Sequence, residues 1–127
     1  MKKTGLALTA AAVASAGLFA SAATAGQTFS TEVDIIDGAL VGDTTYILGE
    51  VESSRRACRS DRIVKLLVRH TKDGPFDVED TDRSSANGVF AVSFDSGVPF
   101  SQAKLRAPRK RLSPTKTCTA DSTPVVF

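Results

Sequence analysis

From residue 26 onward, apolar and polar residues alternate along most of the chain with a period of two, which is typical of half-buried β-strands. In the most apolar run, Val64, Leu66 and Val68 would face one side of a sheet, and Ile63 and Leu67 the other. No stretch has a convincing helical period. The alternation therefore predicts about seven short strands. The runs that carry it are 29–35, 44–53, 63–70, 76–78, 90–94, 103–107 and a terminal run ending Val125-Val126-Phe127.

Turn residues separate these runs. Gly49 lies inside the second run and indicates a bulge or a close approach of another group. Asn87-Gly88 can adopt positive φ in a turn. We expect polar loops at Arg55–Asp61 and at Pro108–Lys116. Short strands at this spacing favour an all-β fold, an antiparallel β-sandwich formed by one domain over residues 26–127.

The first 25 residues read as a secretory signal peptide. Lys2-Lys3 forms a short basic region of the kind found in bacterial signals, an apolar stretch follows, and Ala23-Thr24-Ala25 offers a cleavage site before Gly26. A transmembrane anchor is the alternative, but the segment is rich in Ala, ends in small residues and has no basic flank after it. We expect export to the periplasm or the extracellular space, with no membrane span after cleavage.

Two cysteines, Cys58 and Cys118, lie in the expected mature chain. In an oxidising compartment such a pair most often forms one disulfide. Closing a loop of about 61 residues would stabilise the fold by roughly 4 kcal/mol. A metal site needs more ligands than the lone His70 supplies, and a redox pair usually has Cys-x-x-Cys spacing. We predict a structural disulfide, with no metal and no cofactor.

Charge is ordered along the chain in four blocks of alternating sign. Removing the leader takes away Lys2 and Lys3, so the formal charge of the chain falls from +2 to zero. The basic isoelectric point of the full-length chain is therefore no guide to the partners of the mature protein. The blocks are acidic over 32–52, basic over 55–72, acidic over 73–95 and basic over 104–116. They could pair across neighbouring strands, the interpretation that we favour, or form a two-faced surface that orients partners or self-association.

The last basic block is the candidate binding site. It contains no aromatic residue for stacking on bases, so nucleic acid is not expected. An extracellular protein or an acidic envelope polymer fits better, although a solvated loop is the simpler interpretation. The candidate residues for polyanion binding are Lys104, Arg106, Arg109, Lys110, Arg111 and Lys116.

Two other features are candidates for a chemical role, one as a metal site and one as a catalytic base. The acidic run Asp77–Asp82 offers oxygen ligands for Ca²⁺, but its spacing differs from an EF-hand loop, and a solvated strand edge is the simpler interpretation. His70 is the single candidate base for a Ser-His-Asp triad, and the chain has no Gly-x-Ser-x-Gly motif around a nucleophile. We predict no catalytic residue.

Several short motifs resemble a known family. Gly49-x-Val51-x-Ser53 followed by Cys58-x-x-x-Arg62-x-Val64-x-Leu66 is similar to the opening of prealbumin-like (transthyretin-like) sandwiches, a layout shared by carboxypeptidase regulatory-like domains. Thr81-Asp82 before Asn87-Gly88-x-Phe90 resembles their T-D-x-x-G-x-F hairpin, with extra residues between the Asp and the Gly. The resemblance covers about residues 45–127.

The resemblance implies a non-catalytic module on the cell exterior. The hydrolases of that family use several His residues and a Tyr-Arg-Gly-Ser end, whereas this chain has one His and ends Pro-Val-Val-Phe. The sequence thus predicts a secreted binding or interaction module that is not an enzyme. The alternative is a secreted protease inhibitor that presents an exposed loop, at 98–101 or at 109–115.

Overall fold

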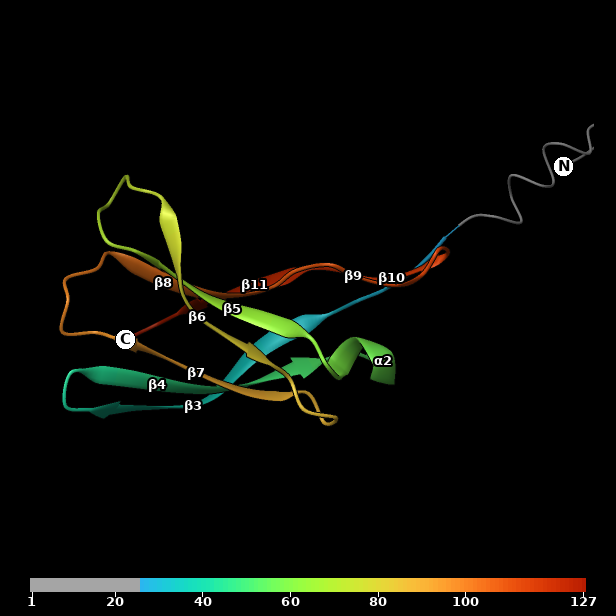
Figure 1. Ribbon diagram of the computed structural model, residues 1–127, viewed down its shortest axis with the longest axis horizontal. Coiled ribbons are helices and arrows are strands. Elements are labelled where there is room, and N and C mark those ends of the chain that lie inside the picture. The colour runs from blue at the N-terminus through green and yellow to red at the C-terminus, as the bar shows by residue number, and fades with distance from the viewer. Residues whose placement is uncertain (1–25) are drawn as a thin grey trace, which may run out of the picture.

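Two antiparallel sheets, packed face to face, carry the alternating runs (Figure 1). The computed structural model describes residues 26–127. One sheet has the order β3-β4-β7, and the other has the order β11-β8-β5-β6. Their strands are β3 (Glu32–Val41), β4 (Thr44–Glu52), β5 (Ile63–Arg69), β6 (Phe76–Arg83), β7 (Val89–Asp95), β8 (Gln102–Ala107) and β11 (Asp121–Val125).

The core lies between the two sheets and consists of the inward side chains of alternate positions. Val64, Leu66 and Val68 are fully buried on β5, as the alternation predicted, and Leu105 lies opposite Leu66 on β8. The predicted β-sandwich is thus confirmed in its class. The remaining buried apolar residues of the core are Val33, Ile47, Val51, Phe90, Val92, Phe94, Ala103 and Ala107.

Over residues 26–127 the structure has more strands than the sequence predicted, ten against about seven. Part of the predicted polar loop Arg55–Asp61 is a one-turn helix, α2 (Arg56–Arg59). The predicted basic loop Pro108–Lys116 is a hairpin of β9 (Lys110–Ser113) and β10 (Lys116–Cys118). These elements are too short to show a period. The hairpin is held because β10 also pairs, in parallel, with β2 (Gln27–Phe29), which builds a third small sheet.

The disulfide between Cys58 and Cys118 is confirmed. Both residues are fully buried, their Cα atoms lie 5.5 Å apart, and 60 positions separate them in the chain. The bond attaches α2 to β10, so it joins the small third sheet to the end of the sandwich.

At two positions only glycine fits, because a Cβ atom would collide with a neighbouring group. Gly49 faces the Phe90 ring, and a Cβ there would overlap it, so the predicted close approach is correct. The bulge lies on the opposite strand, between Ile35 and Asp37. Gly88 has a φ of 90°, and a Cβ there would meet the Val51 carbonyl. This confirms the positive φ predicted for the Asn-Gly turn.

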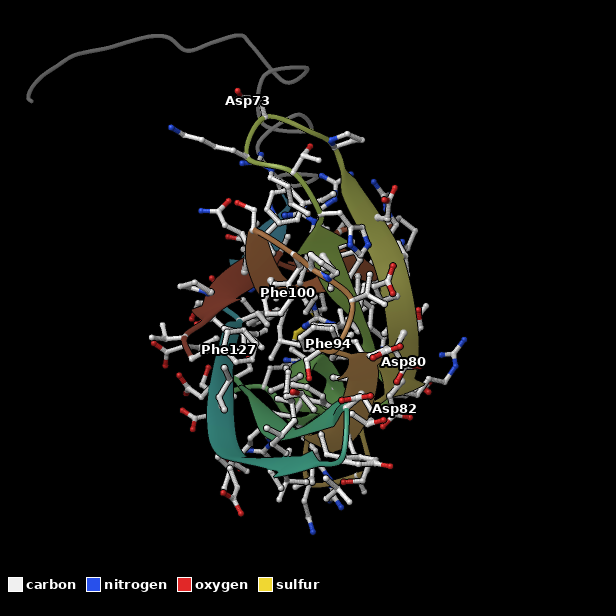
Figure 2. The ribbon with its side chains drawn as sticks, turned by 90° about the vertical axis from the view of Figure 1, so that its left-hand side faces the viewer. Asp73, Asp80, Asp82, Phe94, Phe100 and Phe127 are labelled. Carbon is white, nitrogen blue, oxygen red and sulfur yellow. A yellow bond between two sulfur atoms is a disulfide. The ribbon has the colours of Figure 1, made fainter. Side chains whose placement is uncertain are left out.

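Carboxylates join the two sheets along both of their edges. Asp80 and Asp82 of β6 accept hydrogen bonds from the Ser93 and Ala91 amides of β7, each at 2.9 Å (Figure 2). At the opposite edge, Asp121 of β11 accepts one from the Val33 amide of β3 at 2.8 Å. Edge strands expose unpaired amides that invite aggregation. These edge carboxylates satisfy such amides with side chains.

Candidate binding face

The outer face of the sheet β11-β8-β5-β6 is rich in cations. Lys65 of β5 lies directly opposite Arg106 of β8, and Lys104 lies one outward position further along β8. Their strand neighbours Val64, Leu66, Leu105 and Ala107 are buried, so the alternation of a strand points these cations outward. We call Lys65, Arg69, Lys104 and Arg106 the basic face.

A groove of about 340 Å³ continues the basic face toward the disulfide end. Lys65, Arg83, Arg109 and Lys110 line it, together with one acid, Asp61. Arg83 pairs with that acid at 3.1 Å, and both side chains are exposed. The groove therefore presents more positive charge than its own carboxylate balances.

The six residues predicted to bind polyanions fall into three places. Lys104 and Arg106 belong to the basic face, and Lys104 also lies 4.2 Å from the centre of the Phe76 ring. Arg109 and Lys110 line the groove, but the Lys110 ammonium donates to the Ala57 and Ser60 carbonyls near the end of α2. The last two, Arg111 and Lys116, lie on the β9–β10 hairpin.

Arg62 is a buried cation beneath this surface that the sequence analysis did not single out as a site. It is 1% exposed, and its guanidinium donates to Thr31 Oγ1 and to three carbonyl oxygens at 2.7 to 3.1 Å. Burial lowers its pKa from the ordinary arginine value. The carbonyls belong to Cys58, Pro108 and Thr119, so Arg62 holds together the segments around the disulfide. Arg62 lies two positions before Val64, on the side of the chain that Val64 and Leu66 share, so the alternation is the signal that could have found it. Arginine is rarely buried, and for that reason the signal was not used.

The outer face of the other sheet is acidic. Glu32 lies directly opposite Glu52, and Asp34 lies opposite Glu50. The buried Val33 and Val51 between them set the alternation that points all four carboxylates outward. The charge of Asp34 raises the pKa of Glu52, with smaller contributions from burial, Glu50 and Glu32. We call these four residues the acidic face.

The positions of the acidic face and the basic face distinguish the two interpretations of the charge blocks, which are pairing across neighbouring strands and a two-faced surface. Within residues 26–127 the ion pairs are His70–Glu79 and Arg83–Asp61, and no residue of the acidic face takes part. The acidic block 32–52 and the basic block 104–116 lie on different sheets, so they cannot pair across neighbouring strands. The interpretation that we favoured is therefore wrong for these blocks, and the surface is two-faced. It is correct for the blocks 55–72 and 73–95, because β5 and β6 are neighbouring strands and both ion pairs join these two blocks.

The acidic run Asp77–Asp82 lies on β6 and does not gather into a metal-binding cluster. In the part of the chain that the structure describes, the carboxylates close enough to share a cation are those of Glu32, Asp34 and Glu52, which are exposed. The run instead supplies two of the edge carboxylates, Asp80 and Asp82. Asp80 and Asp82 are two positions apart, so they lie on the same side of the strand, and this alternation is the signal that could have revealed their role at the sheet edge.

His70 follows β5 and is exposed at the surface. Its Nδ1 lies 3.2 Å from the Pro99 carbonyl oxygen and its Nε2 3.5 Å from a Glu79 carboxylate oxygen. The Pro99 hydrogen bond, followed by the contact with Glu79, raises the pKa of His70. This geometry describes a surface histidine held between a carbonyl and a carboxylate.

An apolar pocket of about 600 Å³ opens at the end of the sandwich away from the disulfide. Phe100 and Phe127 line it, and both pack edge to face with Phe94, at centroid distances of 5.2 and 6.0 Å (Figure 2). No local pattern in the sequence indicates this cluster, because the three rings come from separate runs of the chain. The pocket is distinct from the basic face.

Comparisons of the chain with protein-family models, with curated proteins and with solved structures found no match. The prealbumin-like resemblance thus remains a prediction. The signal peptide falls on residues 1–25, outside the described residues. Among residues 26–127, no helix has the length and apolar character needed to cross a membrane. The disulfide is typical of proteins from an oxidising compartment outside the cytosol.

Proposed function

We propose that this protein is a secreted, non-catalytic module that binds an acidic extracellular polymer through the basic face and its groove. The observation that carries the proposal is a set of cations without carboxylate partners. Within the described residues, none of Lys65, Lys104, Arg106 and Arg109 lies within 4 Å of a carboxylate oxygen.

The arrangement of these cations is unfavourable in the free protein. Lys65 and Arg106 are cross-strand neighbours of like charge, which destabilises a sheet by a fraction of a kcal/mol. A bound polyanion relieves this repulsion and releases its own counterions, so the free energy of binding improves. The same cations lie on a rigid sheet, which lowers the entropy lost on binding.

The test measures binding to immobilised dextran sulfate, polyphosphate and hyaluronate, which present sulfate, phosphate and carboxylate groups respectively. We expect the affinity for at least one of them to fall steeply as salt rises, because Coulomb attraction between exposed charges is screened. K65Q/R106Q should weaken binding about tenfold, corresponding to about 1.4 kcal/mol. The control R56Q/K72Q removes the same charge from exposed residues outside the basic face and its groove, and it should leave the affinity unchanged.

Failure of all three polymers to bind at low salt would reject this function. Equal weakening by K65Q/R106Q and R56Q/K72Q would also reject it, since net charge alone would then explain the binding. A preference among the three probes identifies which anionic group the face recognises.

The secretion part of the proposal is supported by the leader pattern and by the disulfide. Expression of the full-length chain in a bacterial host, followed by mass spectrometry of the exported fraction, tests it. We expect a product that begins at Gly26 and lacks two hydrogens relative to the free-thiol mass.

A specific observation also favours the inhibitor alternative. The hairpin β9–β10 extends beyond the two large sheets (Figure 1), and the disulfide at Cys118 anchors its base. Exposed Arg111 lies on this hairpin, and a rigid loop presenting arginine suits a trypsin-like protease. A panel of serine proteases tests this, and the absence of any inhibition at excess protein rejects it. The other candidate loop, 98–101, is less suitable, because Phe100 packs on Phe94.

A further inference from the structure

Like-charged residues face each other across strands on both outer faces of the sandwich, with opposite signs. The acidic face has two such pairs, Glu32–Glu52 and Asp34–Glu50. The basic face has the pair Lys65–Arg106, with Lys104 beside it. Each pair destabilises the free fold slightly. A surface of opposite charge that docks on either face would relieve this repulsion.

The two faces are also alike in spacing. Outward residues repeat about every 7 Å along a strand, and neighbouring strands lie about 4.8 Å apart. Carboxylates on β3 and β4 and cations on β5 and β8 therefore occupy grids of the same dimensions. This match lets several opposite charges come into register at the same time.

Exposed apolar side chains lie next to the charges on both faces. Tyr46, Leu48 and Val89 are 50%, 39% and 36% exposed on the sheet that carries the acidic face. Ile63 and Val78 are 38% and 54% exposed on the other sheet. Protein interfaces combine apolar contacts with a polar rim, and both outer faces offer this combination.

We propose that copies of this protein associate head to tail, with the acidic face of one copy docked on the basic face of the next. The second copy is the occupant favoured here because the charges are complementary. Residues 26–127 contain 14 basic and 14 acidic residues, so whole copies have no net charge that would keep them apart. The proposal shares the basic face with the proposed function, so a bound polymer and a second copy would compete for it.

This mode of association is open-ended. The two faces lie on opposite outer surfaces of the sandwich (Figure 1), so a docked pair still presents one free face of each sign. A heterologous contact of this kind adds further copies until it closes into a ring or continues as a filament. The size of the assembly should therefore rise with concentration and fall with salt.

Sedimentation velocity of the protein expressed from the full-length sequence tests the proposal, with a chelator present so that no metal bridges the acidic faces. At about 20 mM salt and about 200 μM protein, we expect species larger than a monomer, and at about 300 mM salt we expect the monomer alone. E50Q/E52Q and K65Q/R106Q should each abolish the large species. The controls D73N/D77N and R56Q/K72Q should leave them unchanged.

The decisive measurement mixes the two face variants. E50Q/E52Q retains the basic face and K65Q/R106Q retains the acidic face, so an equal mixture should form a dimer of one copy of each and nothing larger. Binding of E50Q/E52Q to the anionic polymers should persist, which separates this proposal from the proposed function. A protein that is monomeric at low salt overturns the proposal, as does a mixture that stays monomeric or a control variant that dissociates the assembly.

Discussion

Replacing Arg62 tests whether one buried cation holds the segments around the disulfide together. Its guanidinium donates four hydrogen bonds, to Thr31 Oγ1 and to three carbonyl oxygens. In Arg62→Met the apolar volume is largely retained, so the main change is that four acceptors, two of them buried and two half-buried, lose their donor. Burial without a partner is costly for such groups.

The expected magnitude follows from two opposing terms. Each hydrogen bond to a charged donor contributes about 1.5–3 kcal/mol to stability, and desolvation of the buried guanidinium costs several kcal/mol. We therefore expect Arg62→Met to lower the free energy of unfolding by about 3 kcal/mol, which corresponds to a fall in Tm of about 15 °C for a domain of this size. Arg62→Lys keeps the charge but cannot reach all four acceptors, so its loss should be intermediate.

Urea unfolding followed by circular dichroism, with the disulfide intact, measures this change. Arg106→Met is the matched control, because Arg106 is an exposed arginine on a neighbouring strand, and its stability should change by less than about 0.5 kcal/mol. If Arg62→Met unfolds at the same urea concentration as the parent protein, the hydrogen bonds of Arg62 do not stabilise this fold.

Three further predictions concern the disulfide, a glycine and the single histidine. Removal of both cysteines, C58A/C118A, should lower the free energy of unfolding by about 4 kcal/mol, and an unchanged urea midpoint would contradict this. G49A should destabilise by about 1–3 kcal/mol, because the added methyl overlaps the Phe90 ring, whereas A91G, at the exposed position next to Phe90 on β7, should change stability by no more than about 1 kcal/mol. His70 should titrate by NMR above its ordinary value of 6.5, because its charged form is stabilised by a carbonyl and a carboxylate. Its stabilising contribution is fully present below pH 6.5 and is lost as the pH rises through the folded pKa, so the stability difference from H70Q should shrink over that range. A His70 pKa at or below 6.5 would refute this.

Much of the fold could be predicted, because burial of one face imposes a period of two on the sequence. The inward residues of β5 and β8 follow directly from that alternation. The helix α2 and the hairpin β9–β10 could not be predicted in the same way. They are three or four residues long per element, and contacts from distant parts of the chain hold them.

The candidate site was less predictable than the fold. The residues Lys104 and Arg106 stood out as a basic run, but Lys65, their neighbour in space, lies about forty positions earlier in the chain. Strand order decides which charge blocks become neighbours, and no local pattern encodes it. The same reason explains why pairing was wrongly favoured between the acidic block 32–52 and the basic block 104–116. Arg62 looked like one more surface cation because arginine is rarely buried, although it shares the inward side of Val64 and Leu66.

The edge carboxylates described above have a consequence for how the molecule opens. Asp80 and Asp82 join β6 to β7, and Asp121 joins β11 to β3, without a backbone ladder between the sheets at those edges. Only one or two side-chain hydrogen bonds join the edge strands at each seam, so a seam that opens leaves every strand paired within its own sheet. Native-state hydrogen exchange should then reveal a low-energy opening in which the Val33, Ala91 and Ser93 amides exchange well before the neighbouring ladder amides of β4.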